Sequence, residues 1–278
     1  AQAAAETAER RLRRLGAGLS ASGPAGLARF VAPDPAAVPV EIRVLGGFQV
    51  LRDGVAAPLG AWQSRKARDL LKILVTRRGR PISREVLGET LWPEDESEAV
   101  AGRLSVALST LRSVLDPDRR FPADHFVAAD ASAVSLRSEN VRVDVDVFFA
   151  SVDAALAATG DDARDLLEAA EAAYAGELLE EDPHAEWAVA LRERARAAYV
   201  RVTHALAALV ARGGDHQEAV DLLLRVLERD PYDERAHRGL VAALQAEGRH
   251  GEARRAHAAY TSRMAEIGAK ASAFPAPS

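Results

Sequence analysis

The stretch QSRKARDLLKILVTRRGRPISR, residues 63–84, indicates how the central part of the chain folds. Ser64 is a residue type that caps helix N-termini, and apolar residues recur from Ala67 to Leu74 at the spacing of one helix face. A turn containing glycine and proline ends this helix, and Ser83 caps a second one. The stretch carries eight Lys or Arg and one acid in a chain of net charge −5. Such an excess is typical either of a nucleic-acid footprint or of the solvated face of an ordinary helix.

The segments on either side complete the pattern of a winged helix-turn-helix. Residues 40–56 alternate apolar and polar side chains around the turn signal Asp53-Gly54, which predicts a small antiparallel sheet. A third amphipathic helix is expected at about residues 98–115, followed by two short β runs around a polar turn. Three helices and a β-hairpin form the winged helix, whose last helix enters the major groove of DNA.

The sequence from residue 147 onward predicts helices, and it contains an internal repeat. Gly214 and Gly248 are 34 positions apart, as are Ala219 and Ala253. This is the tetratricopeptide period, in which helix pairs stack into a solenoid. We therefore expect a mainly α chain with a small β part: a winged helix-turn-helix followed by an all-α tetratricopeptide-like domain. The expected parts are a helix remnant and linker at 1–39, the winged helix at 40–146, the helical domain at 147–268 and a flexible tail at 269–278.

Composition excludes several classes of function. The chain has no Cys, so disulfides and thiolate metal sites are excluded. No apolar run approaches the roughly 20 residues of a transmembrane helix. The sequence has no P-loop motif and its seven His show no metal-ligand spacing. We expect a chain that is not an enzyme and has no catalytic residues, metal, cofactor or membrane partner.

Charge is distributed unevenly between the two expected domains. Residues 39–146 carry 16 basic and 16 acidic side chains, whereas residues 147–278 carry 15 basic and 22 acidic ones. A net charge of 15 − 22 = −7 disfavours contact between the helical domain and a phosphate backbone. Any nucleic-acid contact is therefore expected in the first of these parts.

The ordered series of segments resembles the Streptomyces antibiotic regulatory protein (SARP) family. The matching stretches are VEIRVLGGFQVLRDG (40–54), WQSRKARDLLKILVTRRGRPISREVLGETLWPE (62–94), AGRLSVALSTLRSVLDP (101–117), VRVDVDVF (141–148) and DPHAEWAVALRERARAAYVRVTHAL (182–206). The resemblance implies an OmpR-like winged helix followed by a bacterial transcriptional activator domain. It implies a DNA-binding transcription activator of the bacterial cytoplasm. In some large relatives this module lies at the C-terminal end, so we expect a C-terminal fragment of a larger regulator.

The third helix supplies the candidates for reading DNA. Its outward face is expected to hold Gly102, Arg103, Ser105, Val106, Ser109, Thr110, Arg112 and Ser113. Arginine binds guanine bidentately, hydroxyls make adaptable contacts, and small apolar groups touch the thymine methyl. The residues expected to face base edges are Arg103, Ser105, Val106 and Ser109. The residues expected to reach phosphates, from helix starts or the end of the reading helix, are Arg65, Lys66, Arg84 and Arg112.

Two acidic segments require separate interpretations. The loop WPEDESE precedes the third helix, and the resemblance implies that Glu94, Asp95 and Glu96 contact RNA polymerase. The alternative is a solvated loop whose acids favour the start of that helix. Asp144 and Asp146 alternate with valines, which predicts two outward side chains on a strand.

A second class of function remains open. The winged helix would then have lost its DNA affinity and would act as a protein-interaction or intramolecular regulatory module. The neutral charge of residues 39–146 favours this alternative, and so do Gly102 and Thr110, where the family commonly has larger polar or basic residues. The basic run at 63–84 opposes it. The expected partners are double-stranded DNA and RNA polymerase, with a homodimer as a further possibility.

Overall fold

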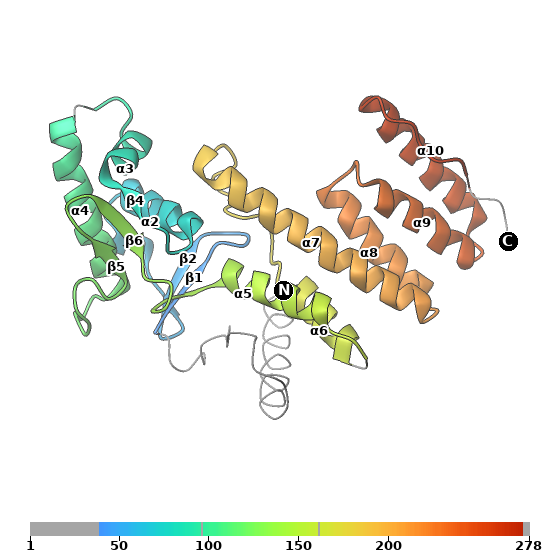
Figure 1. Cartoon of the computed structure of the whole chain (residues 1–278), viewed down its shortest axis with the longest axis horizontal. Helices are drawn as coiled ribbons and strands as arrows, with labels where there is room; N and C mark the ends of the chain where they lie inside the picture. The colour runs from blue at the N-terminus through green and yellow to red at the C-terminus, as the bar shows by residue number, and fades with distance from the viewer. Residues whose placement is uncertain (1–38, 96, 161, 275–278) are drawn as a thin grey trace. The chain divides into compact units, whose positions relative to one another are not determined.

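The computed structural model describes residues 39–95, 97–160 and 162–274 (Figure 1). The helix remnant and linker expected at 1–39 lie, apart from residue 39, outside the described residues. The chain forms two compact units. Among the described residues, the first unit comprises 39–148 together with 175–195, and the second comprises 149–174 and 196–274.

The first unit begins with the predicted antiparallel sheet. Strands β1 (Val40–Arg43), β2 (Gln49–Arg52) and β3 (Val55–Ala56) pair in sequence order, and the expected tight turn lies at Asp53-Gly54. Strand β7 (Arg142–Val143) adds to the far side of β1 in parallel, which gives the order β3-β2-β1-β7.

Three helices follow, as the apolar spacing predicts. They are α2 (Arg65–Arg77), α3 (Arg84–Leu91) and α4 (Ser97–Leu115), with a 3-10 turn, η2 (Leu59–Trp62), before them. Ser64 Oγ accepts a hydrogen bond from the Ala67 amide, and Ser83 Oγ accepts one from the Val86 amide, so both predicted caps are confirmed. Helix α2 packs on α4 through buried leucines.

The predicted hairpin forms the wing. Strands β5 (Val127–Ala129) and β6 (Ala133–Leu136) are antiparallel, and β4 (Ile82–Ser83) pairs with β6 in the order β4-β6-β5. The turn between β5 and β6 is held by Asp130, whose Oδ1 accepts hydrogen bonds from the amides of Ser132 and Ala133. The two strands of the wing are thereby held together, and β4 connects the wing to the start of α3.

The interpretation of Asp144 as an outward strand residue is wrong. Strand β7 ends at Val143, and Asp144 begins helix α5 (Asp144–Ala157). Its carboxylate accepts hydrogen bonds from the amides of Val44 (2.9 Å) and Leu45 (3.0 Å), a hundred positions earlier in the chain. Asp146 is likewise not on a strand, and it forms an ion pair with Arg78 (2.6 Å). Both aspartates therefore connect segments of the first unit that are far apart in the sequence.

The burial of Asp144 predicts that the stability of the first unit depends on pH. Burial raises the pKa of its carboxyl from 3.8 to about 6, although hydrogen bonds from backbone amides act in the opposite direction. A raised pKa in the folded state means that stability is greatest at acid pH and falls as the carboxyl ionises. The difference between 3.8 and about 6 corresponds to about 3 kcal/mol.

The measurement compares the wild type with Asp144→Asn, which does not titrate. We expect the unfolding free energy of the wild type, minus that of the variant, to fall by about 2 kcal/mol between about pH 4 and pH 8, because part of the difference is already lost at pH 4. Urea denaturation followed by tryptophan fluorescence reports it, because Trp62, Trp92 and Trp187 all lie in the first unit. A difference that stays flat across this range would contradict the prediction.

Residues 175–195 also belong to the first unit, whereas the sequence places them in a helical domain from 147. Leu178 forms an antiparallel bridge with Leu45, and Leu179 donates a backbone hydrogen bond to Val44 (2.8 Å). Gly46 and Gly176 pass so closely that a Cβ on Gly176 would lie 3.0 Å from Gly46 Cα. This contact is made by the backbone, which explains why side-chain periodicity does not reveal it.

The second unit is the predicted helical repeat. It contains α6 (Asp162–Ala172), the C-terminal part of α7 (Glu186–Arg212), α8 (His216–Arg229), α9 (Glu234–Ala246) and α10 (His250–Glu266). Gly214 and Gly248 both have positive φ, of 90° and 72°, and Ala219 and Ala253 are both buried. The 34-residue repeat is thus confirmed at matching positions. The fold class is also as expected, mainly α with a winged helix first and stacked helix pairs second.

Candidate nucleic-acid interface

Helix α4 presents the polar face that the spacing predicts, with one correction. Arg103, Ser105, Val106 and Ser109 are all exposed, and the Val106 side chain is exposed by 66%. Thr110 is buried, at 6% exposure, so its placement on the outward face is wrong. The exposed strip is therefore narrower than expected, because α4 packs against both α2 and α3.

The candidate base reader Arg103 is already paired. Its guanidinium forms an ion pair with Asp95, in the loop between α3 and α4. One predicted DNA contact is thus joined to one predicted polymerase contact. Glu94 is exposed in the same loop, and Glu96 lies outside the described residues. Arg103 must exchange this carboxylate for a base edge if it reads DNA.

Arg112 connects α4 to the wing. Its Nη2 donates a hydrogen bond to the Val127 carbonyl (3.2 Å), and its Nε is buried without a partner in the described part of the chain. A hollow of about 440 Å³ lies beside it, lined by Ser105, Ser109 and residues of the loop after α4. Arg112 therefore orients the wing relative to α4, and its phosphate contact remains a prediction.

Arg84 and Lys66 lie near the helix starts where the sequence places them. The backbone amide of Arg84 donates a hydrogen bond to the Ser132 carbonyl, and the side-chain Nη1 of Arg84 donates one to the Asp130 carbonyl (3.2 Å). The side chain is thus directed at the turn of the wing. Lys66 is half-buried at the start of α2. Phosphate contact by either residue remains a prediction.

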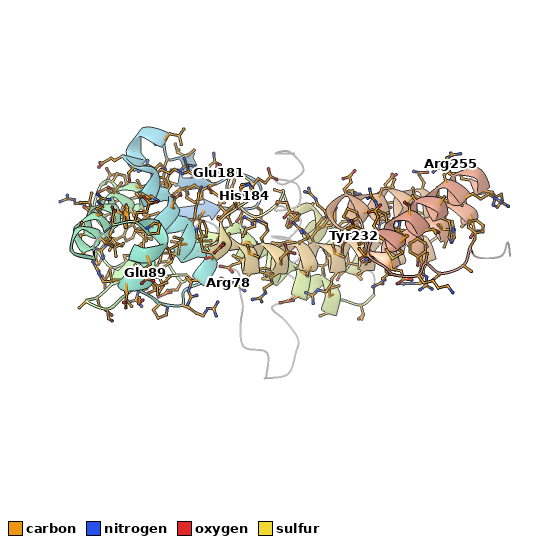
Figure 2. All side chains as sticks on the ribbon, turned by 90° about the horizontal axis from the view of Figure 1, so that it is seen from above. Arg78, Glu89, Glu181, His184, Tyr232 and Arg255 are labelled. Atoms are coloured by element: carbon orange, nitrogen blue, oxygen red, sulfur yellow. The ribbon has the colours of Figure 1, made fainter. Side chains whose placement is uncertain are left out.

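Much of the basic run binds carboxylates of the chain itself. Lys72 is 3% exposed and its ammonium lies 2.5 Å from both Glu181 and Asp182. Arg68 pairs with Glu181 (3.0 Å), and Arg65 lies 3.6 Å from Asp182. We call Glu181 and Asp182 the acidic turn; Glu181 is labelled in Figure 2. Three cations of α2 are thus paired with the two carboxylates of the acidic turn, and Arg65 reaches a phosphate only if it leaves Asp182.

Sequence reasoning missed the acidic turn as a partner of α2. The excess of acids after residue 146 is visible in the sequence, but the pairing joins positions more than a hundred apart. The Lys72 ammonium also lies 4.9 Å from the centre of the Phe48 ring, which adds a cation–π contact. A lysine within the apolar run LLKILV is the one local signal that predicts a buried charge needing a partner.

Two further structural findings bear on function. In the part of the chain that the structure describes, no group of three or more His, Asp or Glu is placed to hold a metal ion. Among the same residues, no helix has both the length and the apolar character needed to cross a membrane.

Comparison with known proteins gives the two parts their families. Residues 61–126 match the model of the transcriptional regulatory protein C-terminal domain, and residues 143–273 match that of the bacterial transcriptional activator domain. The fold resembles that of Mycobacterium tuberculosis EmbR, solved in complex with a low affinity phosphopeptide, with a TM-score of 0.70 and 22% identity. The match covers 85% of this chain and 62% of that one, so this chain spans less than two thirds of EmbR's length. No curated protein matches the chain in sequence.

The two family models follow one another in the order that the fold shows, winged helix first and stacked helices second. Both describe transcription regulators rather than enzymes. They show that the chain combines a transcriptional regulatory C-terminal domain with a bacterial transcriptional activator domain, in the order of the SARP family that its sequence resembles.

Proposed function

We propose that the chain is the DNA-binding part of a larger transcription activator of the bacterial cytoplasm, and that α4 reads a promoter from the major groove. The observation that carries the proposal is the exposed strip of α4. A valine exposed by 66% stands there between serines and next to an arginine, on the last helix of a winged helix. An exposed apolar residue in a small polar surface suits contact with a thymine methyl.

The chemistry of this strip assigns the base-reading roles. Arg103 exchanges Asp95 for the O6 and N7 acceptors of guanine, a bidentate contact that suits its planar guanidinium. Ser105 and Ser109 supply hydroxyls that donate or accept. Val106 provides the apolar contact. The residues proposed to hold phosphates are Arg65, Lys66, Arg84 and Arg112.

The acidic loop before α4 is proposed to contact RNA polymerase through Glu94, Asp95 and Glu96. Its negative charge disfavours contact with phosphates. Binding to direct-repeat sites by a homodimer or by two chains in tandem belongs to the same proposal, since one exposed strip on α4 reads only a few base pairs.

The test measures binding of labelled promoter fragments from the native locus by fluorescence anisotropy. We expect a specific complex whose affinity falls steeply with salt. Arg103→Ala is expected to weaken it by about 1–3 kcal/mol, or roughly 5- to 150-fold, because a bidentate base contact is lost. Arg201→Ala removes an exposed arginine of the second unit and is the matched control.

Two outcomes distinguish failure of the proposed function from failure of the role assigned to Arg103. If no fragment binds at low salt, the proposed function fails. If a specific complex forms and Arg103→Ala leaves it unchanged, only the base-reading role of Arg103 fails.

A regulatory module without DNA affinity is the second candidate function. The pairing of three α2 cations with the acidic turn and the pairing of Arg103 with Asp95 favour it, because both reduce the free positive charge of the first unit. The same titration decides between the two, since this candidate predicts no specific complex at any salt concentration.

A further inference from the structure

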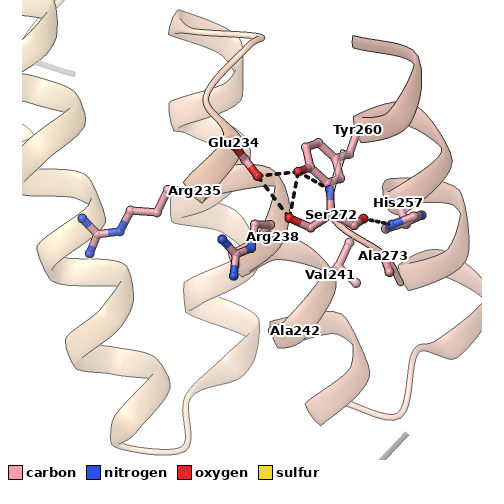
Figure 3. A pocket seen from close by; sticks show the side chains of 10 residues that line it. Glu234, Arg235, Arg238, Val241, Ala242, His257, Tyr260, Ser272 and Ala273 are labelled. Carbon is pink, nitrogen blue, oxygen red and sulfur yellow. Dashed lines mark hydrogen bonds between the residues drawn. The ribbon is translucent and has the colours of Figure 1, made fainter. Parts of the chain in front are cut away.

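Two arginines of helix α9 line a hollow of the second unit. Arg235 and Arg238 are both exposed, stand about one helical turn apart and line a cavity of about 700 Å³ (Figure 3). Within the described residues, neither guanidinium has a hydrogen bond or an ion pair. Other arginines of the second unit are ion-paired, for example Arg164 with Glu218 and Arg225 with Glu171. Glu234 lines the same cavity, but its carboxylate is bonded to Tyr260 and forms no ion pair with either arginine.

The opposite wall is built by an extended segment of the chain itself. Residues 269–274, here called the strap, follow α10 without helix or strand. The Ser272 amide donates to Tyr260 Oη (2.9 Å), and the Ser272 carbonyl lies 2.9 Å from His257 Nε2. Tyr260 is buried and donates to Glu234 (2.7 Å), which fixes its hydroxyl. The strap was expected to be part of a flexible tail, but these bonds hold it against α9 and α10.

The strap shows what kind of molecule this surface accepts. It is held through its backbone amide and carbonyl as well as its side chain, as an extended peptide would be. Between the strap and the arginines, the cavity is lined by the small residues Gly239 and Ala242. The same two residues also line an adjoining hollow of about 270 Å³ towards α7 and α8. A Cβ on Gly239 would lie 3.1 Å from Leu223 Cδ1, so the small size of this residue accommodates that side chain. We call the cavity of about 700 Å³ the α9 groove.

We propose that the α9 groove binds an acidic segment of a partner protein in extended conformation, beside the strap. The guanidiniums of Arg235 and Arg238 each bind a carboxylate, which is the ligand that their planar fork fits best. Alternate side chains of an extended peptide lie about 6.6–6.8 Å apart on one face, so a segment that alternates acids with other residues presents a row of carboxylates to the two arginines.

The test uses the chain 1–278 and two fluorescein-labelled ten-residue peptides. One alternates Glu with Thr, and the other alternates Gln with Thr. By fluorescence anisotropy, we expect the Glu peptide to bind at least about tenfold more tightly, with an advantage that shrinks as salt is raised. The double variant Arg235→Ala/Arg238→Ala is expected to lose that advantage, and Arg235→Lys/Arg238→Lys is expected to recover part of it.

The matched control is Arg201→Ala/Arg255→Ala, which removes the same charge from exposed sites of the second unit outside the groove. It is expected to bind both peptides as the wild type does, and thermal melting checks that each variant is folded. Equal affinity for the two peptides, no binding of either, or an equal loss in the control overturns the proposal. A homodimer seen by sedimentation and lost only in Arg235→Ala/Arg238→Ala would overturn it in favour of a second copy. Promoter binding is measured on the same variants and is expected to be unchanged, so this proposal fails independently of the proposed function.

Discussion

Val106→Asp is expected to weaken specific promoter binding by at least about 100-fold, or roughly 2.7 kcal/mol. The side chain is exposed by 66% on the strip of α4 that carries Arg103 and Ser109. An aspartate there replaces an apolar contact by a carboxylate close to base-edge acceptors and to the phosphates, where like charges repel. Because the site is exposed, the free energy of unfolding is expected to change by no more than about 0.5 kcal/mol.

Val189→Asp is the matched control for this change. Val189 is 46% exposed on α7, in the same unit, and receives the same charge at a helical position away from α4. Anisotropy titrations of both variants at one salt concentration separate a local effect from a general effect of net charge. If the two variants lose affinity equally, or if Val106→Asp binds as the wild type does, α4 is not the reading helix.

The features that the sequence predicts well are those determined within a few residues. Ser64 and Ser83 cap helices because the group that they bind lies three residues ahead. Gly214 and Gly248 mark equivalent turns because their positive φ is a local requirement. The exposed face of α4 follows from its apolar spacing except at Thr110, which lies at the edge of the stripe. Packing against several elements widens the buried face there, and a helical period alone does not show how many neighbours a helix has.

The features that the sequence does not predict depend on contacts between distant positions. Asp144 lies in an alternating run typical of a strand, but in the structure it begins α5 and its carboxylate binds the amides of Val44 and Leu45. Arg112 has the position of a phosphate ligand, but its Nη2 is bonded to the carbonyl of Val127 in the wing. In both cases the partner is a backbone group, which has no distinctive residue type that a sequence could reveal.

Replacing the acidic turn by amides is expected to destabilise the first unit by about 3 kcal/mol. In the Glu181→Gln/Asp182→Asn variant, the ammonium of Lys72, which is only 3% exposed, loses both carboxylates that lie 2.5 Å away. An uncompensated buried charge is costly, whereas the intact contacts contribute less than their removal costs, because Lys72 and Asp182 lost most of their hydration on burial. Urea denaturation followed by tryptophan fluorescence measures the loss, since all three tryptophans lie in this unit.

Adding Lys72→Met to that variant is the decisive step. Methionine keeps most of the volume of the lysine side chain and removes its charge, so the triple variant is expected to regain most of the stability that the double variant loses. Arg201→Met, an exposed change from cation to methionine outside the first unit, is the control and is expected to restore nothing. Recovery would show that the cost lies in the unpaired charge of Lys72. A triple variant as unstable as the double variant would show instead that the acidic turn stabilises the unit through its own hydrogen bonds. The same variants separate two roles of the basic run, because restored stability without a gain in DNA affinity would mean that the α2 cations serve folding and not phosphate binding.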